Sequence, residues 1–263
     1  MKRFLIVLAI VVAAYVIFFN PFRSPSLWFG QQRTSETVTE QVENVEINVG
    51  SIKTEVVLDS GNRVKAELRG RGSVSVRRTG ESINVQTHPS PFSWQWWNHS
   101  KLIITLPRSY ADKLQLTVGS GMLTFNHDSS AINYRTLQVN VSSGSVQLNK
   151  VSSDRAQLKV HSGSLNMDHF SGAFTAQVQS GKAEIDLAKL KGSSSVSVNS
   201  GFAHVNLPDH ADFHLKGKSN SGLIRCTLPL KEKVSGNGVL NGVRGSGKYP
   251  IDATVNSGLL RIE

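Results

Sequence analysis

Cysteine is nearly absent from this chain of 263 residues, in which Cys226 is the single residue of its type. One thiol excludes a disulfide within the chain and a metal site built from several cysteines. We expect Cys226, which lies at an inward position of the repeat described below, to be a small buried apolar residue.

Helical periodicity and metal-ligand spacing are also missing. No stretch after the amino terminus repeats its apolar residues with a period of about 3.6. The eight histidines are scattered, and Pro208 argues against a helix that would bring His210 and His214 together. The segment Gly242 to Lys248 begins like a phosphate-binding loop, but a tyrosine and a proline follow where that motif needs Ser or Thr and a helix. We predict no metal and no cofactor.

The amino terminus lacks a signal-peptide cleavage site. Sixteen uncharged residues run from Phe4 to Phe19, and bulky residues stand where a small-x-small site belongs. This pattern favours an uncleaved transmembrane helix at residues 1–22 over a cleaved signal, followed by a linker at 23–43. Because Lys2 and Arg3 precede the span, we place the amino terminus in the cytoplasm and the rest outside, on a cell membrane crossed once.

Basic residues outnumber acidic ones by 29 to 19, for a formal net charge of +10. Such an excess favours anionic partners such as a membrane surface or a wall polymer. The lysines and arginines are dispersed and not gathered with aromatic residues, so we expect no nucleic acid as a partner.

A Ser-Gly pair recurs in the second half of the chain, each time within the same alternating apolar frame. The spacing is about 20 residues in most cases, which indicates one structural unit stacked on itself. In six of the seven repeats, apolar residues occur three and five positions before the glycine, and in all seven they occur two and four positions after it, with mostly polar residues between them. The glycines are Gly121, Gly144, Gly163, Gly181, Gly201, Gly222 and Gly258.

The predicted fold is all-β: a parallel β-solenoid over residues 44–263, with successive windings lying directly over one another. Residues 44–108 have strand alternation without the regular Ser-Gly pairs, and we interpret them as irregular first layers before the regular repeats at 109–263. Gly50-Ser51 is a candidate first corner.

Each Ser-Gly pair is predicted to form a corner at which the glycine has φ > 0. Asn199, Asn220 and Asn256 precede three of the pairs and tolerate the left-handed conformation. Gly217 and Ser219 replace large apolar residues in the sixth repeat, which predicts a weaker layer or a bulge. The 36 residues before Gly258 contain either an extra layer or a loop.

The Ser-Gly frame, the run Leu102–Pro107 (LIITLP) and the amino-terminal anchor together resemble the bacterial "putative adhesin" or toastrack family. The layout is most similar to LiaG-like membrane-anchored proteins of Gram-positive cell-envelope stress loci. The resemblance covers roughly residues 40–263. It implies an extracytoplasmic β-solenoid without established enzymatic activity, tied to envelope stress or surface interaction, and it carries no catalytic motif to this sequence.

Two groups of residues are candidates for binding. Trp94, Trp96 and Trp97 lie in one loop between strands, where they would cap the open end of the solenoid, contact a membrane interface or stack on sugar rings. A second group forms the outward column three residues after each glycine, which is a solvated face or a binding surface for an extended polymer. This column comprises Thr124, Gln147, Asn166, Glu184, His204, Arg225 and Arg261, of which the last three are candidate binding residues.

Asp168 and Asp186 hold the same offset in adjacent repeats, so stacking would bring their carboxylates to about 5 Å, near the separation in retaining glycosidases. Glu184 is close by, although other repeats have Asn at this offset, as a turn would allow. The sequence therefore predicts a non-catalytic, membrane-anchored solenoid that contacts an anionic envelope polymer, lipid headgroups or another membrane protein. The alternative is a carbohydrate-active enzyme that uses Asp168, Asp186 and Glu184.

Overall fold

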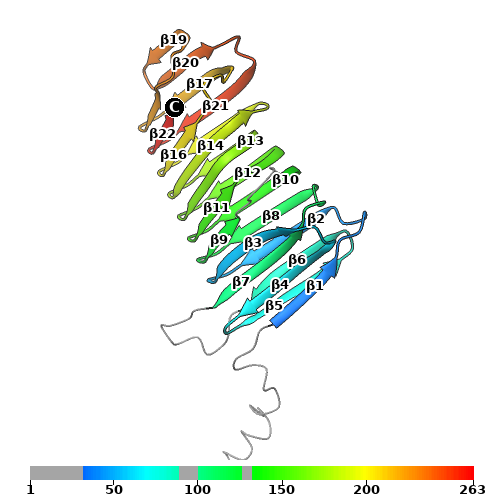
Figure 1. Cartoon of the computed structure of the whole chain (residues 1–263). Coiled ribbons are helices and arrows are strands. Elements are labelled where there is room, and N and C mark those ends of the chain that lie inside the picture. Colours follow the sequence, from blue (N-terminus) through cyan, green and yellow to red (C-terminus); the bar gives the residue numbers. More distant parts are fainter. Residues whose placement is uncertain (1–31, 89–99, 126–131) are drawn as a thin grey trace, which may run out of the picture.

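The computed structural model describes residues 32–88, 100–125 and 132–263, which form an elongated stack of strands (Figure 1). Within these ranges no helix is long and apolar enough to cross a membrane. The predicted anchor at 1–22 and the cluster of Trp94, Trp96 and Trp97 lie outside the described residues. For the described residues, the prediction of an all-β fold is confirmed.

The described strands belong to one continuous sheet that winds around a shared core. In chain order they are β1 (Gln32–Thr37), β2 (Asn44–Val49), β3 (Lys53–Asp59), β4 (Arg63–Arg69), β5 (Ser73–Thr79), β6 (Ser82–His88), β7 (Lys101–Pro107), β8 (Lys113–Val118), β9 (Met122–Phe125), β10 (Ile132–Val141), β11 (Ser145–Asn149), β12 (Val151–Val160), β13 (Ser164–Val178), β14 (Lys182–Leu190), β15 (Ser194–Val198), β16 (Phe202–Asn206), β17 (Phe213–Ser219), β18 (Leu223–Cys226), β19 (Lys231–Gly236), β20 (Val239–Arg244), β21 (Tyr249–Val255) and β22 (Leu259–Ile262).

Each regular layer consists of a strand that enters a Ser-Gly corner and a strand that leaves it. β10 pairs in parallel with β8 on one side and β12 on the other, and β11 pairs in the same way with β9 and β13. Alternate side chains point inward, so that Val141, Val160 and Val178 are each no more than 2% exposed. Burial of one such valine contributes about 1.5–3 kcal/mol relative to leaving it exposed.

A third side closes the middle layers, because β12 begins directly after the second bend of the coil and β13 and β14 run on past it. Phe170 and Phe174 on β13 are buried there and pack edge to face, with ring centroids 6.5 Å apart. Such aromatic pairs contribute about 0.5–1.5 kcal/mol beyond their buried area.

The amino-proximal layers join the same sheet in an order that differs from the chain. The β2–β3 layer lies between the β8–β9 layer and the β6–β7 layer, with parallel pairing on both sides. Gly50 forms the predicted first corner, and its carbonyl accepts the N–H groups of Ser120 and Gly121. Antiparallel strands cover this end: β4 pairs with β7 and β1, and β5 pairs with β6.

The carboxyl end also departs from chain order, so the prediction that windings stack successively is wrong there. β21 pairs in parallel with both β15 and β17, and β22 pairs with both β16 and β18. The layer of Gly258 therefore lies between the layers of Gly201 and Gly222. The seven predicted glycines still form one column.

The apolar pattern explains this order. Val196 and Val198 on β15 stack on Ala253 and Val255 of β21, all at most 2% exposed. The corresponding positions of β17 are Gly217 and Ser219, which would leave these valines without large apolar neighbours. The strand with the more complete apolar set occupies the interior position.

The segment before Gly258 contains an antiparallel hairpin and not an extra layer. β19 pairs with β20, and β20 pairs with β17 and closes this end. Of the two alternatives predicted for the sixth repeat, a weaker layer or a bulge, the bulge is wrong, because β17 keeps continuous register with β21 through Gly217. A Cβ on Gly217 would lie 2.7 Å from the Leu240 carbonyl oxygen, so glycine permits β20 to approach. Cys226 lies in the terminal layer and is half-buried, and this burial raises the pKa of its thiol.

The prediction of φ > 0 at the Ser-Gly corners is wrong. None of the seven glycines is among the positive-φ residues of the described chain, and neither are Asn199, Asn220 and Asn256. Glycine is required because the layers approach closely: a Cβ on Gly163 would lie under 3.0 Å from the carbonyl oxygen of Gly144. The same contact recurs at each regular corner, so hydrogen-bonded stacking and not backbone strain selects glycine.

Candidate binding surface

The predicted outward column after the glycines exists in the structure, with its last two members exchanged. Glu184 is in register with His204, His204 with Arg261, and Arg261 with Arg225. The structure therefore brings together His204, Arg225 and Arg261, as the sequence predicted. The ion pairs of these side chains indicate which kind of ligand the column suits.

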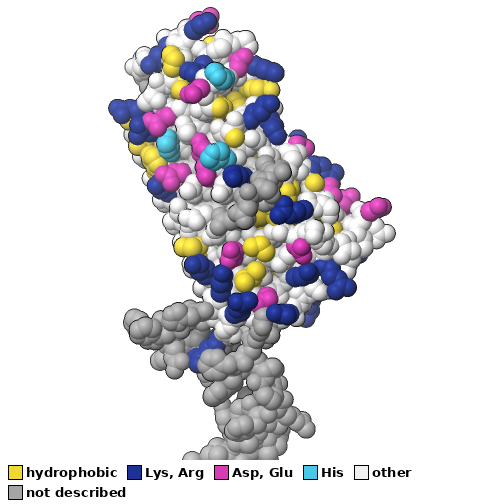
Figure 2. All heavy atoms as spheres, viewed as in Figure 1, with side chains coloured by type: hydrophobic (Ala, Val, Ile, Leu, Met, Phe, Trp, Pro, Cys, Tyr) yellow, Lys and Arg dark blue, Asp and Glu magenta, His cyan; other side chains and the backbone are white. Residues whose placement is uncertain are grey.

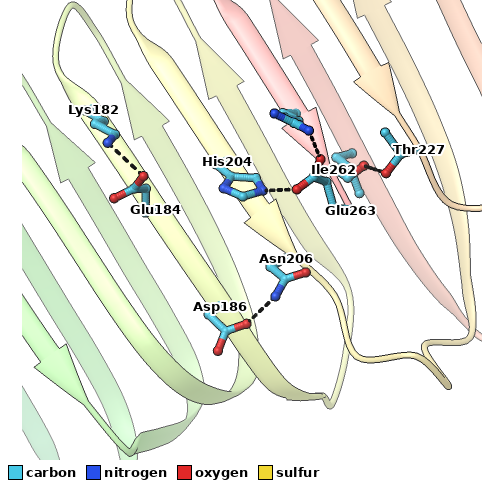
Figure 3. Close-up of polar contacts among 9 residues, drawn as sticks. Lys182, Glu184, Asp186, His204, Asn206, Thr227, Ile262 and Glu263 are labelled. Carbon is cyan, nitrogen blue, oxygen red and sulfur yellow. Dashed lines mark hydrogen bonds and ion pairs between the residues drawn. The ribbon is translucent and has the colours of Figure 1, made fainter.

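Acidic side chains neutralise much of this column (Figure 3). Glu184 Oε1 forms an ion pair with Lys182 Nζ at 2.7 Å, and Glu263 Oε2 lies 3.0 Å from His204 Nε2. Glu263 also pairs with Arg261. On the face shown in Figure 2, acidic, basic and histidine side chains lie intermingled over the upper part of the stack. A surface of mixed sign gives little net attraction for a polyanion.

Asp168 and Asp186 meet as predicted, near the bend at which β11 ends and at which the register between β13 and β14 shifts. One ligand atom from each of Asp168, His169 and Asp186 lies within 4.8 Å of the others. His169 Nδ1 is 2.8 Å from Asp168 Oδ1 and 3.9 Å from Asp186 Oδ2. Asn206 donates its amide to Asp186 Oδ1 at 2.7 Å (Figure 3).

This cluster could hold a divalent cation through two carboxylates and an imidazole. The carboxylate separation also approaches the value of about 5–5.5 Å in retaining glycosidases. Both carboxylates are engaged, however, and the register places Asn149 beside Asp168 and Asn206 beside Asp186. The offset therefore accepts Asn and Asp alike, as the turn interpretation predicted.

A different surface lies on the strands that lead into the corners. Residues four and two positions before each glycine point outward, and from β12 to β17 these positions form two adjacent columns across five layers. All ten side chains are exposed, and we call this surface the corner groove. In spatial order its pairs are Lys159 and His161, Gln177 and Gln179, Ser197 and Asn199, Thr254 and Asn256, and Lys218 and Asn220.

The groove has a measurable hollow and an ordered wall. A depression of about 390 Å³ runs over its first three layers, between the two columns. Asn256 donates its amide to Asn199 Oδ1 at 2.9 Å, and Asn220 donates to Asn256 Oδ1 at 3.1 Å. This ladder fixes three side chains in one direction, and it explains the recurrent Asn that the sequence interpretation assigned to backbone conformation.

A larger depression of about 660 Å³ lies near the starts of β2, β6, β8, β10 and β12, of which only β12 also contributes to the corner groove. It is lined by Lys113, Arg135 and Arg155 together with Glu43, Glu81 and Asp154. Arg135 pairs with Asp112 at 2.7 Å, and Asn133 donates to Asp154 at 3.0 Å. This depression carries both signs of charge within a few residues.

Sequence reasoning found the column after the glycines and missed the columns before them. The missing signal was in the repeat frame: from Lys159 onward, the positions four and two before each glycine contain no Asp or Glu. A comparison of the charged residues before and after each glycine would have distinguished the face without carboxylates from the face that carries them.

Comparisons with known proteins concern almost the whole described chain. A family model described as Toastrack DUF4097 matches residues 42–263. A comparison with curated proteins found no match.

Solved structures with a similar fold include two described as a "putative adhesin", from Bacteroides fragilis and Parabacteroides distasonis. Their identities to this chain are 12% and 10%, with TM-scores of 0.48 and 0.49. The alignments cover 89% of this chain in both cases, and 97% and 98% of the other chains. A "putative lipid binding protein" from Parabacteroides distasonis is 11% identical, with a TM-score of 0.47 and coverage of 89% and 97%.

Proposed function

The chain belongs to the toastrack DUF4097 family, and from this premise we propose that it is a non-catalytic, membrane-anchored extracytoplasmic protein that works by contact with the cell envelope. The observation that supports the proposal is the register of outward side chains across consecutive layers. In the corner groove alone, equivalent positions from β12 to β17 are held in adjacent rows.

A surface of this kind suits an extended partner. Backbone hydrogen bonds between neighbouring layers fix the spacing of the rows at about 4.8 Å. Side chains that are already ordered lose less conformational entropy when a partner binds. The arrangement offers many similar contacts in a line and no single enclosed reaction chamber.

The location is the second part of the proposal. Residues 1–22 would anchor the protein, residues 23–43 would act as a linker, and residues 44–263 would lie outside the cytoplasm. Lys2 and Arg3 before the apolar run support this orientation through the positive-inside rule. An adhesin-like role, and a place in the envelope-stress response as in LiaG-like proteins, fit this layout.

Reporter fusions and co-sedimentation test the two parts. A reporter joined after residue 40 is expected to be active only outside the cytoplasm, and activity only inside would reverse the orientation. The detergent-solubilised full chain is expected to co-sediment with purified envelope material. Failure to bind wall, membrane or envelope-protein fractions at physiological salt would refute the contact role.

A carbohydrate-active enzyme is the second candidate, and the proximity of the Asp168 and Asp186 carboxylates favours it. We expect no release of reducing ends from wall or plant polysaccharides by the full chain. If the parent does cleave one of them, the double variant Asp168→Asn and Asp186→Asn is the decisive comparison. Loss of that activity in a normally folded variant would replace the contact role with catalysis.

A further inference from the structure

We propose that the corner groove binds a linear, phosphate-rich polyol polymer that lies along the axis of the stack, across the strands. The inference rests on the proposed contact function and names its surface and ligand chemistry. The groove is the set of ten residues defined above, from Lys159 and His161 to Lys218 and Asn220.

Charge selects the class of ligand. The ten side chains include two lysines and a histidine and no carboxylate. Lys159 and Lys218 have no ion pair among the described residues, and no carboxylate shares their rows. In the other column Arg225 likewise has no ion pair within the described part of the chain, but Arg261 and His204 lie against Glu263, and Glu184 is itself a member of the column. The nearest acid on these strands is Asp252, whose register partner on β17 is Lys216. Unpaired cations on an acid-free strip attract an anion.

Distance selects a polymer over a single anion. Lys159 and Lys218 stand at the two ends of a row of five layers. At about 4.8 Å per layer, four steps separate their backbones by roughly 19 Å. One phosphate cannot contact both ends, but a chain with repeated phosphates can.

The residues between the lysines suit the hydroxyl groups of a polyol. Gln177, Gln179 and the Asn ladder offer amide donors and acceptors, and Ser197 and Thr254 offer hydroxyls. Asn256 uses one N–H in the ladder, and an amide has a second N–H and further acceptor capacity. Successive side chains on one face of a strand are about 6.6 Å apart, so the two columns flank a channel of molecular width.

The other surfaces fit a polyanion less well. The column after the glycines carries Glu184 and Glu263, and the bend beside it carries Asp168 and Asp186. The depression near Arg155 includes Glu43, Glu81 and Asp154. A polyanion on either surface would meet carboxylates at close range.

The test measures the affinity of the full chain in detergent for synthetic poly(glycerol phosphate). The salt concentration is about 0.15 M, at which the Debye length is about 8 Å. The groove variant is Lys159→Gln with Lys218→Gln. The matched control is Lys189→Gln with Lys231→Gln, which makes the same charge change at exposed positions outside the groove. We expect the groove variant to bind about tenfold more weakly and the control to change less than about twofold.

An uncharged variant and a competitor separate recognition from general attraction. Gln179→Ala, which leaves the charge unchanged, is expected to weaken binding a fewfold. Millimolar inorganic phosphate is not expected to displace the polymer, because it cannot span the row. Equal losses in the groove and control variants would reduce the effect to net charge and overturn the proposal.

Further binding experiments distinguish failure of this proposal from failure of the contact function. If the chain sediments with envelope material but does not bind poly(glycerol phosphate), the groove assignment fails while the contact role stands. Binding only to phosphate-free glycan strands, or only to anionic vesicles of phosphatidylglycerol, would likewise overturn the ligand class. Loss of all envelope binding would instead remove the proposed function itself.

Discussion

Each Ser-Gly corner is a point of backbone contact between layers, and at the residue scale this makes the glycine hard to replace. A Cβ at Gly163 would lie within 3.0 Å of the Gly144 carbonyl oxygen and of the Val141 side chain. The layers cannot separate freely, because Ser164 N–H donates to the same carbonyl at 2.9 Å. We expect Gly163→Ala to destabilise the fold by about 1–3 kcal/mol, as measured by denaturant unfolding.

Gly50 provides a matched control in the first corner. Its φ is not in the left-handed region, and the nearest atom to an added Cβ is Thr87 Oγ1 at 3.7 Å. Gly50→Ala should therefore change the unfolding free energy by less than about 0.5 kcal/mol. Equal destabilisation by the two substitutions would contradict the close-contact explanation.

The residues that sequence reasoning misjudged are those whose role depends on a neighbouring layer. The period of two assigned the inward side chains correctly, because alternation is a local property of a strand. Asn199 and Asn256 are 57 positions apart in the chain and donate and accept one hydrogen bond. Nothing local to either residue indicates that bond.

At the element scale, the turn between β20 and β21 depends on one carboxylate. Asp212 accepts the backbone N–H groups of Ser246 and Lys248, each at 2.9 Å, and the Ser246 hydroxyl at 2.7 Å. The Lys248 bond is the leading cause that lowers the pKa of Asp212 below its ordinary value of 3.8. The folded state therefore favours the charged carboxylate.

A lowered pKa in the folded state gives a defined pH dependence. The stabilisation is complete above the unfolded pKa and is lost as the pH falls through the folded pKa. We expect Asp212→Asn to lower the melting temperature at pH 7 and to lose this effect progressively below about pH 4. Asp209→Asn, which makes the same change at an exposed neighbour, should follow the parent at each pH. A constant difference between Asp212→Asn and the parent across this range would contradict the assignment.

Strand existence was predictable and strand partnership was not. Every layer presents the same alternation, so the pattern that indicates a strand does not identify its neighbours. Gly217 shows the consequence: the sequence marked it as anomalous, but its cause is the passage of β20 over β17. The same limit applies to the candidate site. The sequence predicted the column that contains His204, but it did not predict the contact of His204 with Glu263 from another layer.

At the scale of the whole molecule, the regular Ser-Gly period was sufficient to predict an all-β stack around one column of corners. The order of the layers at both ends escaped prediction, because long returns of the chain can place a later layer beneath an earlier one. The apolar residues within 251–255 determine which layer lies next to that of Gly201. They are visible in the sequence, but the sequence does not show that they pack on Val196 and Val198.

The inserted layer makes the carboxyl end of the molecule dependent on its last residues. β21 and β22 join the layer of Gly201 to the layer of Gly222. A chain that ends at Lys248 lacks both strands and would have to place β17 directly on β15. Gly217 and Ser219 would then face Val196 and Val198, which would lose the large apolar neighbours that Ala253 and Val255 help to complete in the parent stack.

We therefore expect hydrogen exchange in the chain that ends at Lys248 to show loss of protection throughout 213–244, while β10 and β12 stay protected. Neighbouring layers of a solenoid stabilise each other locally, so the loss should not spread through the stack. A control chain that ends at Ile262 retains both strands and should keep the parent pattern. Continued protection of Leu215 and Gly217 in the shorter chain would mean that β17 can dock on β15, and that apolar completeness does not determine the order of the layers.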